Sequence, residues 1–157
     1  MRLTNSLMFS IVLVSLLTSG CHKKSGIDRF IYQKDGVIKD TKTGLQWAQD
    51  AGQMMTWDQA NSYARNLRLG GYSDWRLPNK EELNSLVEYA KSQGFEKWIN
   101  ELFNRKGFKN VEARDYWSAT PSADDKERAW LIDMEDGSEF SGYKNVDHHV
   151  WPVRGGQ

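Results

Sequence analysis

The chain has 157 residues, of which 21 are Lys or Arg and 21 are Asp or Glu, so its formal net charge is zero. A nucleic-acid-binding protein normally carries a clear basic excess, so the charge balance argues against a nucleic-acid partner. Hydrophobic residues make up 39% and charged residues 27% of the chain, a composition typical of one globular domain and not of a disordered segment.

The N-terminus has the pattern of an export signal. Arg2 supplies positive charge, and residues 7–17 form an apolar run that is shorter than the roughly 20 residues of a membrane-spanning helix. Small residues at 18–20 then precede Cys21, as in a bacterial lipobox, although Thr18 stands where that motif usually has Leu. An ordinary cleaved signal and a buried structural helix are the alternatives. Cys21 is the one cysteine of the chain, so no intrachain disulfide can form and we expect Cys21 to carry a lipid.

Lipidation at Cys21 predicts the organisation of the mature protein. Residues 1–20 would be removed as the signal peptide, residues 21–28 would form a polar tether, and residues 29–157 would form one domain. Several acyl chains on one cysteine anchor a protein stably in a bilayer. His22 follows the cysteine where an Asp would resemble an inner-membrane sorting signal, so we expect the outer membrane as the destination.

Short strands are predicted at the start of the domain, over residues 30–33, 37–40 and 45–48. Asp35-Gly36 lies between the first two strands and is a hairpin-turn dipeptide. Residues 41–44 are expected to form the turn between the second and third strands.

Two predicted helices begin with a capping box, Thr56 followed by Gln59 and Asn79 followed by Glu82. Glycines are expected to end both helices, because glycine accepts the left-handed backbone that follows a helix. Gly70-Gly71 would end the first helix and Gly94 the second. Each helix carries an apolar stripe at helical spacing: Trp57, Ala60, Ala64 and Leu67 in the first, and Leu83, Leu86, Val87 and Ala90 in the second.

The next segment predicts a third helix over about residues 95–106, closed by Gly107. Its apolar stripe comprises Phe95, Trp98, Ile99, Leu102 and Phe103.

The C-terminal third is predicted to return to strands, over residues 116–119, 129–134, 138–143 and 150–154. Asp136-Gly137 is a strong hairpin signal between the second and third of these strands, and a polar loop is expected over residues 121–128. Strands, then helices, then strands, without βαβ alternation, predict an α+β fold in which helices flank an antiparallel sheet.

The sequence lacks the common catalytic motifs HExxH, CxxC and GxSxG. Glu81 and Glu82 are neighbours on a helix and do not face one another as an acid/base pair would. Residues 133–139 resemble a calcium loop only loosely, because Gly137 is one position early. We therefore expect no enzymatic activity, no cofactor and no metal.

Two neighbouring histidines, His148 and His149, follow Asp147 near the C-terminus. They could contribute to a metal site, but adjacent residues of an extended segment point to opposite faces. We interpret this segment as a polar loop before the last strand.

Residues 71–78, with the sequence GYSDWRLP, form the most distinctive stretch of the chain. Trp75 and Leu77 would alternate inward, and Pro78 would stop the strand before the second helix. Arg76 could reach Asp74 or a carboxylate of that helix and so fix the strand to the helix. We interpret as structural the residues Trp75, Arg76, Leu77, Pro78, Trp117, Trp130 and Trp151.

Several segments, taken in order and spacing, resemble the C-terminal domain family of the Legionella collagen-like adhesin. The similarity extends over about residues 36–155, and the segments that carry it are TGLQW at 43–47, TW at 56–57, GGYSDWRLP at 70–78, YWSAT at 116–120, AW at 129–130 and PVR at 152–154. This resemblance implies an extracytoplasmic domain of C-type lectin-like fold. For the adhesin that gives the family its name, membership implies binding to sulfated polysaccharides.

Three features separate this chain from the better understood relatives of that fold. The sequence contains no Gly-x-y collagen stalk, so it gives no reason to expect trimerisation through a stalk or the avidity that such a trimer would provide. The EPN and WND motifs of calcium-dependent lectins are absent, so sugar binding should not need calcium. Residues 76–82 also look similar to formylglycine-generating enzymes, but those hold copper with a cysteine pair, and here only Cys21 is present.

Two functions remain open at this point. The first is a polysaccharide-binding lipoprotein whose candidate polyanion site is Arg105, Lys106, Lys109 and Arg114, with Phe108 interleaved. The second is a structural lipoprotein that binds another envelope protein and no sugar. The four basic side chains have a plainer interpretation too, because Arg105 and Lys106 complement the dipole at the end of the third helix.

Overall fold

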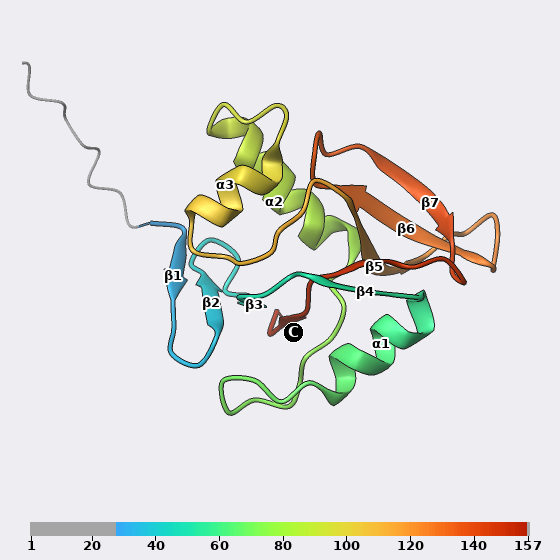
Figure 1. Cartoon of the computed structure of the whole chain (residues 1–157), viewed down its shortest axis with the longest axis horizontal. Helices are drawn as coiled ribbons and strands as arrows, with labels where there is room; N and C mark the ends of the chain where they lie inside the picture. The colour runs from blue at the N-terminus through green and yellow to red at the C-terminus, as the bar shows by residue number, and fades with distance from the viewer. Residues whose placement is uncertain (1–27, 157) are drawn as a thin grey trace, which may run out of the picture.

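The computed structural model describes residues 28–156, which form two β-sheets and three helices (Figure 1). The smaller sheet is antiparallel and has the order β1 (Phe30–Tyr32), β2 (Val37–Asp40), β3 (Gln46–Ala48) and β9 (Val153–Arg154). Asp35 and Gly36 both have positive φ, 63° and 78°, at the tip of the β1–β2 hairpin. This confirms the predicted turn.

The larger sheet has the order β4 (Gln53–Met55), β8 (His148–Val150), β5 (Asp115–Pro121), β6 (Arg128–Asp133) and β7 (Glu139–Tyr143). Its neighbours are antiparallel except β5 and β8, which are parallel. The segment at His148 and His149 is therefore a strand, and its interpretation as a polar loop is wrong. Main-chain pairing with β4 and β5 holds it extended.

The helices are α1 (Trp57–Asn66), α2 (Lys80–Ser92) and α3 (Ile99–Arg105). Both predicted capping boxes are confirmed. In α2 the Asn79 side chain accepts from the Glu82 N–H at 2.7 Å, and the Glu82 carboxylate accepts from the Asn79 N–H at 2.8 Å. Gly94, with a φ of 85°, follows the end of α2 as expected.

Two predicted helix boundaries are wrong, one because of a local turn and one because of a contact with a distant segment. α1 ends at Asn66, before Gly70-Gly71, because those glycines instead form a tight turn that pairs Leu69 with Tyr72. α3 begins at Ile99, whose N–H donates to the Glu135 carbonyl. Trp98 is left-handed and 53% exposed instead of belonging to the apolar stripe.

The larger sheet separates two apolar clusters, as the alternation along its strands requires. Tyr116 and Ile132 face the main core with α2, α3 and the smaller sheet, whereas Trp117 and Leu131 face α1. Within residues 28–156 every buried side chain lies between Arg29 and Val153, so a chain that begins at residue 22 keeps this whole core. The α+β fold class is confirmed, and the C-type lectin-like assignment stays a prediction.

Candidate binding surfaces

The GYSDWRLP segment joins the end of the chain to the start of α2. Arg76 exchanges two main-chain hydrogen bonds with Val153, each 2.9 Å long, and its guanidinium binds both carboxylate oxygens of Glu82 at 2.6 and 2.7 Å. A third bond of 3.0 Å reaches the Gly155 carbonyl. Trp75 and Leu77 are buried on either side of Arg76. These contacts assign the segment to the scaffold.

Replacing Arg76 with Ala is expected to lower the free energy of unfolding by about 1–3 kcal/mol, because Glu82 and the Gly155 carbonyl lose their donor in a largely enclosed position. Arg105→Ala is the matched control, since its ion pair with Glu101 is exposed and should change stability by no more than about 0.5 kcal/mol. Denaturant unfolding measures both variants. Equal stability of the Arg76 variant and the wild type would contradict the scaffold role.

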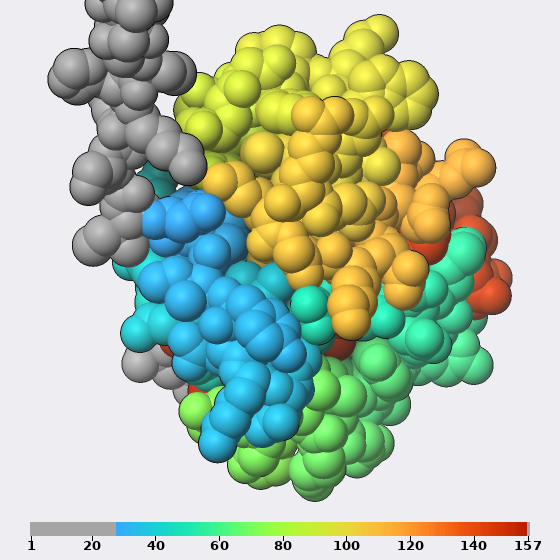
Figure 2. All heavy atoms as spheres, turned by 60° about the vertical axis from the view of Figure 1, so that its left-hand side comes forward, coloured from blue at the N-terminus to red at the C-terminus, as the bar shows by residue number. Residues whose placement is uncertain are grey.

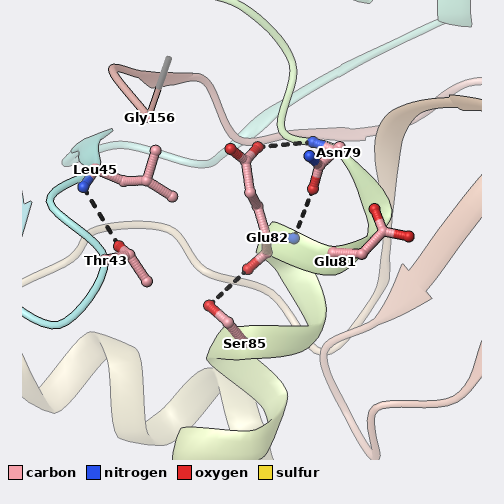
Figure 3. A pocket seen from close by; sticks show the side chains of 7 residues that line it. All are labelled: Thr43, Leu45, Asn79, Glu81, Glu82, Ser85 and Gly156. Carbon is pink, nitrogen blue, oxygen red and sulfur yellow. Dashed lines mark hydrogen bonds between the residues drawn. The ribbon is translucent and has the colours of Figure 1, made fainter.

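A shallow hollow of about 260 Å³ lies beside this junction, between the β2–β3 turn, the first turns of α2 and Gly156 (Figure 3). The polar groups of Asn79, Glu82 and Ser85 in this hollow are bound within the scaffold. Glu82 binds Asn79 and Arg76, and the Ser85 hydroxyl donates to the Glu82 carbonyl at 3.0 Å. Figure 3 shows the Glu81 carboxylate pointing away from Glu82. The two carboxylates therefore do not form an acid/base pair here.

Three of the tryptophans interpreted as structural are buried and donate their indole N–H to main-chain carbonyls, and that of Trp75 donates to the Leu69 carbonyl at 3.2 Å. The indole N–H of Trp117 donates to the Met55 carbonyl at 3.0 Å, and that of Trp151 donates to the Ala48 carbonyl at 2.9 Å. Trp130 differs, because it is only half-buried and lies on an open part of the larger sheet.

A second surface comes from cross-strand neighbours on the β6–β7 hairpin. Arg128 pairs with Tyr143 and Trp130 pairs with Ser141, so these four side chains share one face of the sheet. Ile132, further along β6 on that face, packs under α2. α2 begins at Lys80, beside Trp130, and leaves the remainder of the face open.

Cations lie over both aromatic rings of this open face. The Lys80 Nζ atom is 4.3 Å from the centre of the Trp130 ring, and the Arg128 guanidinium carbon is 4.1 Å from the centre of the Tyr143 ring. Tyr143 is 52% exposed. We name the set Lys80, Arg128, Trp130 and Tyr143 the cation–aromatic ledge.

Sequence reasoning missed this ledge although its signal was present. The Asp136-Gly137 turn fixes which residues of β6 and β7 lie opposite one another. Counting away from the turn along both strands places Arg128 opposite Tyr143. The position of Lys80 could not be read in this way, because it depends on how α2 packs on the sheet.

The predicted polyanion site is partly occupied by internal contacts. Arg105 binds Glu101 at 2.8 Å and Lys106 binds Asp28 at 3.1 Å, while Phe108 is buried in the main core and faces no ligand. Lys109 and Arg114 are exposed and form no ion pair within residues 28–156. We name Arg105, Lys106, Lys109 and Arg114 the basic patch. Cys21, the other predicted site residue, lies outside the described residues.

The two histidines of β8 lie on opposite faces of the sheet. His148 packs its ring edge-on against Trp117, with its Nδ1 atom 3.5 Å from a carboxylate oxygen of Asp115. His149 is buried beside Tyr116, and its Nδ1 atom has no hydrogen-bond partner. Among residues 28–156 no group of three or more metal-ligating side chains is found.

The pH dependence of stability is expected to carry a contribution from His149. Burial lowers the pKa of its imidazole, more than the backbone of Ala51 raises it. The unfolded chain, with a His pKa of about 6.5, then takes up a proton that the folded chain does not. The free energy of unfolding therefore falls as pH drops from about 6.5 toward the lower folded pKa. Unfolding of His149→Phe at a series of pH values should show a smaller fall, and an unchanged profile would contradict this account.

Comparison with known families gives one match for this chain. The family described as the Lcl C-terminal domain matches residues 36–154. The search of curated proteins found no match. In the part of the chain that the structure describes, no helix has the length and apolar character needed to cross a bilayer.

Proposed function

The chain belongs to the Lcl C-terminal domain family, and from that premise we propose that it is a lipid-anchored envelope protein whose domain binds polysaccharide without catalysis. The family resemblance noted in the sequence is thereby confirmed. Members are extracytoplasmic, adhesin-like bacterial domains of mostly undefined function, which places this domain in the cell envelope. The polysaccharide ligand, the anchor at Cys21 and the outer membrane are the parts that we propose.

The cation–aromatic ledge is the observation that carries the polysaccharide proposal. One side of a pyranose ring presents mainly C–H groups, which pack well on an aromatic face such as Tyr143 or Trp130. Arg128 pairs with Asp125 at 3.6 Å and Lys80 with Glu139 at 3.0 Å, and we expect their remaining N–H donors to bind sulfate or carboxylate substituents of the sugar. The ledge therefore suits an acidic polysaccharide better than a neutral one.

The carboxylate nearest the ledge favours binding over hydrolysis. Glu139 accepts from Lys80 at 3.0 Å and from Asn84 at 2.6 Å. The hydrogen bond from Lys80 is the main reason that the pKa of Glu139 is lowered, so this side chain stays ionised. A glycosidase needs a carboxylic acid that is protonated near neutral pH, and Glu139 is tuned in the opposite direction.

A protein partner is the second candidate function, because the edges of the larger sheet carry exposed apolar side chains. Met54 on β4 is 55% exposed, and Phe140 on the other edge strand, β7, is 38% exposed. Unpaired edge strands with apolar side chains are sites where a partner strand can add to a sheet.

A binding panel distinguishes the two candidates. The chain from His22 to Gln157 would be applied to immobilised heparin, dextran sulfate, polygalacturonate and neutral dextran, beside a cross-linking pull-down from envelope extract. Retention on the acidic polymers, with release by salt and no effect of EDTA, is the expected result. Passage through all four columns, together with one cross-linked envelope protein, would favour the protein partner instead.

A further inference from the structure

Part of the basic patch lies where the described chain begins. Asp28, the first described residue, is bound by Lys106 at 3.1 Å. The next residues hold β1 against α3, because the Phe30 ring packs on Phe103 and Phe108 at centre-to-centre distances of 5.7 and 5.3 Å. Figure 2 shows the gold segment that contains α3 beside the blue β1–β2 hairpin on one face.

We propose that the basic patch binds the anionic phospholipid headgroups of the membrane in which the chain is anchored. This proposal rests on the lipid anchor at Cys21, and it assigns a partner to the patch that is distinct from the polysaccharide on the ledge.

The length of the tether restricts how far this face can lie from the bilayer. Asp28, the first described residue, lies seven residues after Cys21. A fully extended chain spans at most about 3.6 Å per residue, so the tether reaches no more than about 25 Å. The face that contains Asp28 and Lys106 therefore stays near the headgroups.

The charges of this face are complementary to an anionic surface. Lys109 and Arg114 are exposed without an ion pair inside the described chain, and the tether adds Lys23 and Lys24. Each basic residue within about a Debye length of an anionic membrane strengthens attachment severalfold. Glu112 is an exposed acidic residue between Lys109 and Arg114, and it offsets part of the attraction to the membrane.

The position of the ledge is consistent with this orientation. Figure 1 places β1 at one end of the long axis of the molecule and the β6–β7 hairpin at the other. A domain whose basic patch rests on the membrane would present Trp130 and Tyr143 away from it, where a polysaccharide can reach them.

Flotation with vesicles tests the proposal without relying on the lipid anchor. The chain from His22 to Gln157 would be mixed at low salt with vesicles of equal parts phosphatidylcholine and phosphatidylglycerol, or of phosphatidylcholine alone. We expect binding to the first vesicles only, and a loss of at least about tenfold in apparent affinity for Lys109→Glu/Arg114→Glu. Arg65→Glu/Lys126→Glu is the matched control, because it makes the same change in net charge at exposed positions outside the patch and should lose much less.

Three outcomes would overturn the proposal. The first is no binding of the wild-type chain to the anionic vesicles, and the second is an equal loss in the patch and control variants. The third is a patch variant that loses retention on dextran sulfate but keeps vesicle binding, because the patch would then bind polysaccharide. Thermal melts of all variants confirm that they fold, and binding of Tyr143→Ala to dextran sulfate reports on the ledge separately.

Discussion

Replacing Asp40 with Ala is expected to lower the free energy of unfolding by about 3–5 kcal/mol, because it leaves a buried guanidinium without its counter-ion. Arg29 donates to both oxygens of Asp40, at 2.8 and 2.6 Å, and both residues are buried. The same guanidinium donates to the Ser85 carbonyl at 3.0 Å and lies 4.9 Å from the centre of the Tyr89 ring. The pair thus fastens the first strand to β2 and to α2.

The pKa of Asp40 agrees with a strong native contact. Burial would raise this pKa, but the hydrogen bonds from Arg29, Thr43 and Lys42 together outweigh it, and the pKa is lowered. The contribution of Asp40 to stability is therefore full above its unfolded pKa of about 3.9 and is lost as pH falls through the lower folded pKa.

The double variant Arg29→Met/Asp40→Leu separates the loss of a partner from the value of the pair itself. Apolar residues of similar volume often replace a buried ion pair at little cost, so this variant should recover most of the stability that Asp40→Ala loses. Denaturant unfolding of all three chains measures the difference. If Asp40→Ala lowers the free energy of unfolding by less than about 1 kcal/mol, the ion pair of Arg29 and Asp40 does not stabilise the fold as its geometry indicates.

Changing Cys21 to Ser is expected to abolish membrane attachment of the mature protein. The thiol is the group that would be acylated, and each buried CH₂ group of an acyl chain contributes about 0.8 kcal/mol to anchoring. Incorporation of labelled fatty acid and fractionation of cells report the two consequences directly. The basic patch alone should not hold the chain on membranes at physiological salt, because exposed charges are screened within about 10 Å.

Ser25→Ala is the matched control for this experiment, since it changes the predicted tether and keeps the cysteine. That variant should carry the lipid and fractionate with membranes as the wild type does. If Cys21→Ser still incorporates labelled fatty acid, the lipid is attached to another residue and Cys21 is not the anchor.

The elements that could be predicted from the sequence are those whose determinants lie within a few residues. The turn at Asp35-Gly36 depends on two left-handed residues, and the start of α2 depends on hydrogen bonds between Asn79 and Glu82. The ion pair of Arg76 was foreseen because its candidate partners lay within six residues. Such short-range signals survive in any tertiary context.

The features that could not be predicted depend on pairing between distant segments. β4 has two exposed residues, Gln53 and Met54, and no apolar alternation; it is a strand because β8 pairs with it almost a hundred residues later. The expected strand over residues 150–154 divides into β8 and β9, which belong to different sheets. Trp98 matched the helical stripe, but contacts of Ile99 and Asn100 with the turn that follows β6 set the start of α3.

The candidate surfaces show the same division. The four residues of the basic patch were evident as a local run of charge, but the ion pair of Lys106 with Asp28 crosses 78 residues and the burial of Phe108 depends on the main core. The ledge needs the β6–β7 register and the packing of α2 together. A run of like charges is thus easily found in a sequence, whereas an aromatic surface assembled from three elements requires the fold.

The affinity of Tyr143→Ala for dextran sulfate, measured beside Tyr32→Ala, tests the central claim most directly. Both tyrosines are more than half exposed, at 52% and 58%, but Tyr32 lies on β1, far from the ledge along the molecule. The account predicts that the wild-type chain binds dextran sulfate and not neutral dextran, that Tyr143→Ala loses about tenfold in affinity, and that Tyr32→Ala matches the wild type. Equal affinities of the two variants, or a wild-type chain that binds neither polymer, would contradict polysaccharide binding at the ledge.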